Sequence, residues 1–372
     1  AVAANGRLAF VADGNGGLRV IDVLDASAPR EVGSWTLGPA MDVDVAGSIA
    51  CVVGWSGLPQ RPEMSVIDVG DPSAPVRVGR VETASYHLFR VRVSGTMAYV
   101  LGDPSTIQAI NLSVPAAPRE VARIAVPAVT DFEASDGHLY VASALGLVIV
   151  NVADPTSPST VATVAVLGST DRVAVSGRTV LVAGRVHPDG GRSVRALDVS
   201  DPAHPQEAGL LELADHPAPR RAPFAPGGDI ADIAMGHGRA YLTTDYVAGV
   251  APARGYVAVL DPATASPLRP LAAVATVSGR DVAASSHRAY VLGGGSLQLV
   301  DVSQPSAPRM LSSLSGLVGG VGVAAEGQAL FVVDSAGLLA VVDASDAALP
   351  RVVGKLHVAD RANSLTVSNG TA

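Results

Sequence analysis

The chain has 372 residues, of which 48% are hydrophobic and only 4% aromatic, and its formal net charge is −8. Because only 16% of the residues are charged, the composition argues against binding to nucleic acid, which needs clustered Lys and Arg, and against an anionic membrane surface. No apolar stretch approaches the roughly 18 residues that a membrane helix needs, so no transmembrane segment is predicted. The single cysteine, Cys51, lies in an apolar run and is predicted to be buried.

The first recurring element is a short Val-rich strand that ends in Asp or Asn and precedes a proline turn. One copy runs from Val66 to Val69 and is followed by Asp-Pro-Ser-Ala-Pro at residues 71–75. Asp suits such a turn because its carboxylate accepts hydrogen bonds from nearby backbone N–H groups, while Pro presets φ. The acid or amide recurs eight times, at Asp22, Asp68, Asn111, Asn151, Asp198, Asp261, Asp301 and Asp343. The spacing of about 40 residues therefore predicts eight repeats in one structure.

Each copy contains four strand-like pieces, which in the second copy are residues 42–45, 49–53, 64–69 and 76–81. Four short strands per repeat, with no helical periodicity, are typical of propeller blades. The sequence thus predicts an all-β fold: a single eight-bladed β-propeller domain over residues 1–372, with four-stranded antiparallel blades. The expected blades are residues 7–40, 41–88, 89–130, 131–169, 170–228, 229–279, 280–318 and 319–361.

Ring closure is expected at blade 1, whose innermost strand must come from one end of the chain. Residues 362–370 match the innermost strand of every other copy, so they are predicted to close the ring by joining blade 1. Residues 2–6 are the rival for the same position. An unpaired innermost strand would leave backbone groups exposed.

The strand at residues 147–151, Leu-Val-Ile-Val-Asn, makes the chain resemble the LVIVD-repeat family of bacterial and archaeal surface proteins. The resemblance covers essentially the whole chain and is specific for the fold. It implies a secreted, periplasmic or cell-surface location and a binding role. No signal peptide is visible at Ala1, and a mature or trimmed chain would have lost one.

Departures from the repeat are where function is expected. The long insertions, at residues 55–63, 185–192, 214–228 and 246–255, all fall in connections predicted to lie on one side of the ring, called here the upper face. We expect them to form a pocket wall above blades 5 and 6, although exposed loops are the simpler alternative. The candidate residues in these insertions are Trp55, Arg61, His187, His216, Arg220 and Tyr246.

A second group of candidates lies where the innermost strands begin, at the mouth of the central channel. Several strands begin with an acid, namely Asp42, Asp131, Asp171, Asp232 and Asp281. These carboxylates could hold a divalent cation or a basic ligand group. Alternatively, each caps backbone N–H groups at its own strand, a structural role that would explain the repetition. Blade 3 breaks the pattern with Tyr86, His87 and Arg90.

Two functions remain open at this point. The first is a binding module for a glycan, small molecule or protein, with Trp55, Arg61, Tyr86, Asp131, Asp171, Arg220, Tyr246 and Asp281 as ligand-binding candidates. The second is an enzyme of lyase, isomerase or hydrolase type, with His87, Arg90, His187 and His216 as catalytic candidates. No organic cofactor motif is evident. A closed ring needs no partner to fold, so a monomer is compatible with the sequence.

Overall fold

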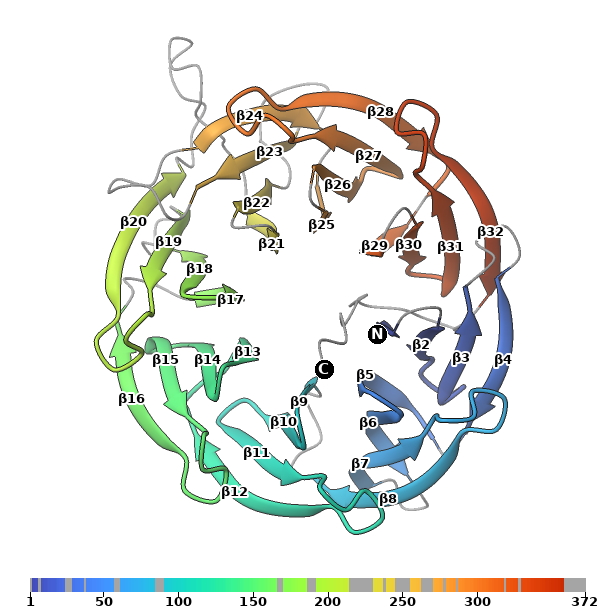
Figure 1. Cartoon of the computed structure of the whole chain (residues 1–372), viewed down its shortest axis with the longest axis vertical. Helices are drawn as coiled ribbons and strands as arrows, with labels where there is room; N and C mark the ends of the chain where they lie inside the picture. Colours follow the sequence, from blue (N-terminus) through green and yellow to red (C-terminus); the bar gives the residue numbers. More distant parts are fainter. Residues whose placement is uncertain are drawn as a thin grey trace.

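The computed structural model is a ring of eight four-stranded antiparallel sheets around a central channel (Figure 1). It describes residues 2–5, 8–23, 29–36, 38–56, 61–83, 90–165, 170–185, 192–213, 230–236, 239–244, 255–261, 270–276, 279–285, 287–317, 319–326 and 329–357. These residues form strands and turns. Among them, no helix is long and apolar enough to cross a membrane. The predicted eight-bladed β-propeller is confirmed.

The strands follow one another outward in each blade, so that the first strand borders the channel and the fourth forms the rim (Figure 1). The innermost strands of blades 1 to 8 are β1 (Val2–Asn5), β5 (Ala40–Ala46), β9 (Arg90–Ser94), β13 (Asp131–Ser135), β17 (Thr170–Ser176), β21 (Ile230–Gly236), β25 (Asp281–Ala284) and β29 (Gly320–Glu326). The second strands are β2 (Leu8–Ala12), β6 (Ile49–Ser56), β10 (Met97–Asp103), β14 (His138–Ser143), β18 (Thr179–Arg185), β22 (Arg239–Thr244), β26 (Arg288–Gly293) and β30 (Ala329–Asp334).

The third strands are β3 (Leu18–Asp22), β7 (Arg61–Asp68), β11 (Thr106–Asn111), β15 (Gly146–Asn151), β19 (Arg192–Asp198), β23 (Gly255–Leu260), β27 (Ser296–Asp301) and β31 (Leu338–Asp343). The rim consists of β4 (Arg30–Trp35), β8 (Val76–Glu82), β12 (Arg119–Ala125), β16 (Ser159–Val164), β20 (Gln206–Leu213), β24 (Pro270–Thr276), β28 (Arg309–Ser315) and β32 (Arg351–His357).

The repeated acid at the end of the third strand organises the turn that follows it. Asp68 Oδ1 accepts a hydrogen bond of 2.8 Å from the backbone N–H of Gly70, and Asn151 Oδ1 accepts one of 2.9 Å from that of Ala153. Asp or Asn is favoured here because its short side chain can reach the N–H two residues later. The expected role of this residue is confirmed.

The hydrophobic core is divided among the eight interfaces between neighbouring blades. Both faces of each sheet are covered, which explains the Val-rich composition of the central strands. Between blades 8 and 1, for example, Phe331 and Val341 pack with Val11 and Ile21, all at most 2% exposed. Side-chain packing therefore joins the last blade to the first.

The prediction that residues 362–370 close the ring by pairing in blade 1 was wrong. The position next to β2 is occupied by β1, which pairs with it from Val2 opposite Val11 to Asn5 opposite Leu8. Residues 2–6, the rival in the sequence, supply the strand because they are covalently adjacent to β2 and need only a short turn. Residues 362–370 lie outside the described part of the chain.

The hairpins between the second and third strands of a blade lie on the same face of the ring as the links from one blade to the next, as the sequence predicted. The hairpin between β10 and β11 contacts the link between blades 3 and 4, where Val126 N donates to Ser105 O at 3.1 Å. Between blades 7 and 8, Leu317 N donates to Gly295 O at 3.0 Å. The innermost strands begin at this upper face, so their first side chains lie at the upper mouth of the channel.

The interpretation of residues 55–63 as a loop was wrong at both ends. The β6–β7 ladder continues through Trp55, opposite Pro62, to Ser56, opposite Arg61. The longer ladder is stabilised because Glu63 is buried on β7 with ion pairs to Arg77 (3.1 Å) and Arg80 (3.6 Å). The other three insertions lie largely outside the described residues.

Candidate functional site

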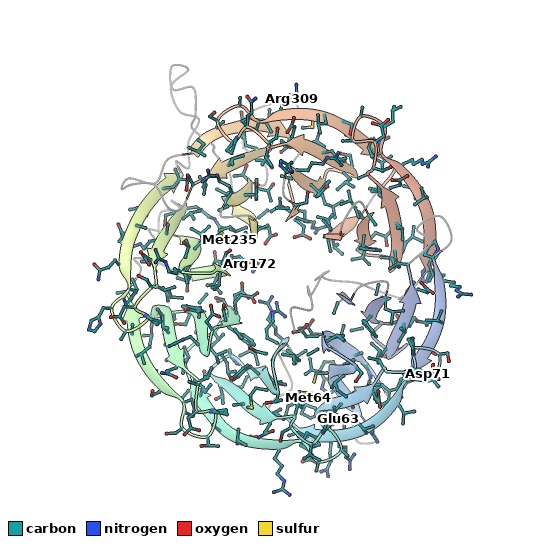
Figure 2. The ribbon with its side chains drawn as sticks, viewed as in Figure 1. Glu63, Met64, Asp71, Arg172, Met235 and Arg309 are labelled. Carbon is teal, nitrogen blue, oxygen red and sulfur yellow. The ribbon has the colours of Figure 1, made fainter. Side chains whose placement is uncertain are left out.

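The channel contains a cavity of about 550 Å³ that extends along the innermost strands from their upper ends. It is lined by residues from the innermost strands of blades 3 to 8 and from the links leading into them. Figure 2 shows Arg172 and Met235, from blades 5 and 6, at the inner edge of the ring. A volume of this size lies within the range of about 300–1,000 Å³ that is common for small-molecule sites.

The strand register sorts residues of the innermost strands, most of which line the cavity, into two columns around the ring. The first column is defined by Asp42, Arg90, Asp131, Arg172, Asp232, Asp281 and Gly322, which occupy one level in blades 2 to 8. The second column, two residues further along each strand, consists of Asp44, Arg92, Glu133, Ala174, Ala234, Ala283 and Ala324. Side chains two apart on a strand point to the same face, so both columns are directed the same way.

The carboxylates of the first column fasten each blade to the next one. Asp131 Oδ2 accepts from the backbone N–H of Val173 in blade 5 at 3.1 Å, and Asp281 Oδ2 accepts from that of Val323 in blade 8 at 2.6 Å. Asp42 and Asp232 make the same contact with the blades that follow them. These acids thus accept hydrogen bonds from backbone N–H groups, as the structural alternative expected, but the donors lie mainly in the neighbouring blade and not in the acid's own strand.

In blades 3 and 5, arginine replaces the acid and reaches the next blade by an ion pair. Arg90 pairs with Asp131, and Arg172 Nε lies 4.0 Å from Asp232 Oδ1. In the second column, Arg92 Nε lies 3.5 Å from Glu133 Oε1. The charges of the first column thus alternate in sign from blade 2 to blade 6.

The charged side chains differ in how openly they face the cavity. The side chain of Arg172 is 46% exposed, that of Glu133 36% and that of Arg90 31%, whereas those of Asp232, Arg92 and Asp131 are 22%, 16% and 6% exposed. Burial, together with repulsion from Arg92, lowers the pKa of Arg90 to about 10. Arg172 is therefore the most exposed of these six groups, and its guanidinium group offers N–H donors to a ligand.

Asp232 and Asp281 form a carboxyl pair in which the two side chains hydrogen bond to each other. Burial raises the pKa of both groups, and the negative charge of Asp232 raises that of Asp281 further. Two neighbouring carboxylates in a poorly solvated site disfavour each other's ionisation. The pair therefore takes up a proton more readily than two separate, solvated carboxylates would.

Replacing Asp281 by Asn is expected to stabilise the protein at neutral and alkaline pH, by an amount of the order of 1 kcal/mol. The pKa of Asp281 is higher in the folded protein than in the unfolded chain, so binding of its proton stabilises the folded state. This stabilisation is complete below the ordinary carboxyl pKa of the unfolded chain, and it is lost as the pH rises through the raised pKa of the folded protein. Asn keeps an acceptor for Val323 N and a donor for Asp232 without needing the proton. Denaturant unfolding from pH 4 to pH 9 measures the effect, and parallel profiles for the two proteins would contradict it.

A further buried acid of the second column, Asp44, bridges blades 2 and 3. Its Oδ2 accepts from the backbone N–H of Val93 at 2.7 Å. Burial raises the pKa of Asp44 to about 6, while that hydrogen bond and the charge of Arg92 oppose the shift. Asp44 does not line the cavity.

The structure brings together four of the residues singled out from the sequence: Arg90, Asp131, Asp232 and Asp281 line the cavity. Asp171 does not, because the strand bulges between Thr170 and Arg172, and Arg172 takes the position expected for the acid. Asp171 Oδ2 instead accepts from Arg192 Nη1 at 2.8 Å.

Two candidates lie elsewhere on blade 2. Trp55 borders a small crevice with Trp35 and Pro39, and the exposed Arg61 lies 3.4 Å from Glu82. The remaining candidates fall outside the described residues, namely Tyr86, His87, His187, His216, Arg220 and Tyr246.

Sequence reasoning missed Arg92, Glu133, Arg172 and Arg280, which also line the cavity. The signal was present in the innermost strands, which read Arg-Val-Arg-Val at residues 90–93, Asp-Phe-Glu-Ala at 131–134 and Arg-Val-Ala-Val at 172–175. Alignment of these strands by alternation, rather than by their acids, would have identified both columns. Among the described residues, no group of three or more His, Cys, Asp or Glu side chains is placed to hold a metal ion.

Comparison with protein families assigns the repeat. The LVIVD repeat model matches residues 1–36, 37–83, 128–166, 167–211, 278–315 and 321–358, which together make up more than half of the chain. The chain belongs to the LVIVD-repeat family. The two longest stretches without a matched LVIVD repeat are residues 84–127 and 212–277, which include β9 and β21. Both strands line the cavity, so the least typical repeats border the candidate site.

Solved structures with low sequence identity share the fold. The computationally designed Ika8 protein is 10% identical, with a TM-score of 0.66 over 87% of this chain and 89% of that one. Apo AztD from Citrobacter koseri is 17% identical, with a TM-score of 0.58 over 95% and 96%. Sqt1 from Chaetomium thermophilum, bound to the N-terminus of the ribosomal protein L10, is 14% identical, with a TM-score of 0.62 over 85% and 86%. No curated protein matched the chain.

Proposed function

We propose that this LVIVD-repeat propeller is a binding protein that takes a small anionic ligand in the cavity at the upper mouth of its channel. The observation that carries the proposal is the exposure of two guanidinium groups there, those of Arg172 and Arg280. Four arginines (Arg90, Arg92, Arg172 and Arg280) and four acids (Asp131, Glu133, Asp232 and Asp281) line the cavity, so its formal charges balance. Burial raises the pKa of Asp232 and Asp281, which disfavours the negative charge of these two acids.

Arg172 and Arg280 are the best placed to contact such an anion. Arg172 is nearly half exposed, and its nearest described carboxylate oxygen, on Asp232, is 4.0 Å away. Arg280 is exposed, and no ion pair joins it to another residue in the described part of the chain. A guanidinium group has five N–H donors, so both side chains keep donors for a carboxylate or a phosphate.

Arg172→Ala is expected to weaken anion binding about tenfold, which corresponds to ~1.4 kcal/mol. The test titrates phosphate, acetate and benzoate at constant ionic strength, with choline and glucose as cationic and neutral comparisons, and follows the rise in melting temperature. Arg309→Ala is the matched control, because Arg309 pairs with Asp301 at the outer rim, far from the channel (Figure 2).

The wild-type protein and Arg309→Ala should respond to anions and not to choline or glucose. Two results would rule out binding in the cavity. One is an equal loss of the rise in melting temperature in Arg172→Ala and Arg309→Ala, and the other is no rise with any anion in the wild-type protein.

The carboxyl pair supports a second candidate function, an enzyme of lyase, isomerase or hydrolase type at the same mouth. Asp281 would give up its proton and Asp232 would accept one, while Arg172 held an anionic substrate. Such an enzyme would convert its bound anion, which NMR of the ligand detects directly. Asp281→Asn should then bind the anion without converting it.

A protein or glycan partner on the upper face is the remaining alternative. The similarity to Sqt1 concerns the fold alone at 14% identity, so it does not favour a peptide ligand for this chain. The proposed location is extracytoplasmic, on the basis of membership in a family that is associated with surface proteins. Fractionation of cells that produce the protein tests the location, and recovery in the cytoplasmic fraction would contradict it.

A further inference from the structure

Half of the cavity lining carries no charge. In the second column, blades 3 and 4 have Arg92 and Glu133, whereas blades 5 to 8 have Ala174, Ala234, Ala283 and Ala324. Val175, Met235, Ala284, Val321 and Ala325 add to the same side. The change occurs within blade 5, where Arg172 and Ala174 are two residues apart on one strand.

The alanines leave open volume because large side chains behind them fill the space between the blades. Ala234, Ala283 and Ala324 are paired with Tyr241, Tyr290 and Phe331 on the second strands. These three aromatic residues are at most 2% exposed and belong to the clusters between the blades. The aromatic residues occupy the interface and the small alanines border the channel, so this side of the cavity is an apolar wall supported by a packed core.

We infer that the ligand is an organic anion with an apolar body: a monocarboxylate whose carboxylate contacts Arg172 and whose hydrocarbon part lies on the alanine wall. The inference rests on the proposed binding function and specifies the class of ligand. A small inorganic anion would use the arginines but leave the wall of blades 5 to 8 in contact with water. An apolar body displaces that water, and Met235 can adapt to its shape because its thioether chain is flexible and unbranched.

The structure favours this orientation because charge and apolar surface meet at Arg172. This side chain begins the charged arc that continues through Asp131 and Arg90, while Ala174 begins the apolar arc on the same strand. The carboxyl pair Asp232–Asp281 lies at the mouth above the apolar wall.

The test uses a homologous series of straight-chain carboxylates, from acetate through butyrate and hexanoate to octanoate, measured by isothermal titration calorimetry on the whole protein. Each methylene that moves from water to the wall should tighten binding about fourfold, until the cavity is full. Butylammonium and hexylammonium are the matched cations and should show no such series. The measurement needs no variant, so it does not depend on the folding of an altered protein.

Ala283→Leu then locates the binding. The added side chain occupies part of the wall, so the dependence of affinity on chain length should flatten, with octanoate losing more affinity than acetate. Ala234→Leu is the second variant at the same level, and circular dichroism checks that each one is folded.

Failure of this inference is distinguishable from failure of the proposed function. Carboxylates that all bind with the affinity of acetate would support an anion site and overturn the apolar body. A chain-length series that persists in both folded leucine variants would also overturn it, because the hydrocarbon would then lie elsewhere. An absence of binding by every anion would overturn both proposals.

Discussion

Asp131→Ala is expected to lower the free energy of unfolding by about 3–5 kcal/mol, the loss typical when one partner of a buried ion pair is removed. Asp131 is 4% exposed and serves three partners. Its two carboxylate oxygens accept from the backbone N–H groups of Phe132 (2.9 Å) and Val173 (3.1 Å), and it pairs with Arg90. Alanine removes the link between blades 3, 4 and 5 and leaves the Arg90 guanidinium without its nearest counter-charge.

The origin of that loss can be separated by further variants. Asp131→Asn keeps an oxygen for one backbone N–H group and removes only the charge, so we expect an intermediate loss. Combining Asp131→Asn with Arg90→Leu removes the unpaired cation as well, and stability should recover relative to Asp131→Asn alone.

Denaturant unfolding of the wild type, Asp131→Asn, Arg90→Leu and the double variant gives the coupling energy. Strictly additive effects of the two substitutions would show that the ion pair is not part of the structural link. An unchanged stability of Asp131→Ala would contradict the role given to this residue.

The repeat was readable from the sequence because its turns depend on local chemistry. The Asp or Asn side chain contacts an N–H group only two residues away, so the same letters produce the same turn in every blade. The closing strand was not readable in the same way, because residues 2–6 and 362–370 both match the pattern of an innermost strand. The choice between them depends on proximity to β2, which the pattern of apolar residues does not encode.

Only some of the residues that line the channel were predicted from the sequence, because strand pairing, like the closing strand, is not encoded in the pattern of apolar residues. The acids at the start of the innermost strands were identified, and Arg90, which lines the cavity, was among the candidates. However, the side chain that occupies each level is decided by pairing with the second strand. The bulge between Thr170 and Arg172 moves Asp171 out of the column and brings Arg172 in. A one-residue change of register reverses the direction of a side chain, so residue identity alone could not locate the arginines.

The cavity itself results from divergence between repeats. Where the second column is charged, in blades 2 to 4, ion pairs and backbone contacts occupy the channel. Where it is alanine, in blades 5 to 8, the channel remains open. A ring of identical blades would be uniformly filled or uniformly open, so the variation among repeats creates a cavity with one charged and one apolar side.

The proline turns hold the outer part of the ring together by packing on the preceding blade. Figure 2 shows Asp71, which begins the turn of blade 2, at the outer rim beside β4 of blade 1. A Cβ atom on Gly33 of β4 would come closer than 3.0 Å to Pro72 O in that turn. One blade further on, a Cβ atom on Gly79 of β8 would similarly meet Pro115 O and Pro118 Cδ. Glycine is required at these positions because backbone approaches backbone, with no flexible side chain that could move aside.

Gly79→Val is therefore expected to destabilise the protein by about 3 kcal/mol, at the upper end of the cost of overpacking. Valine favours strands more than glycine does, so strand propensity alone would predict the opposite sign. Ala122→Gly is the matched control, because Ala122 has the corresponding place in blade 3, opposite Ala109 as Gly79 is opposite Val66. It should cost no more than about 1 kcal/mol. Denaturant midpoints measure both effects, and a Gly79→Val protein as stable as the wild type would show that the turn of blade 3 does not rest on β8.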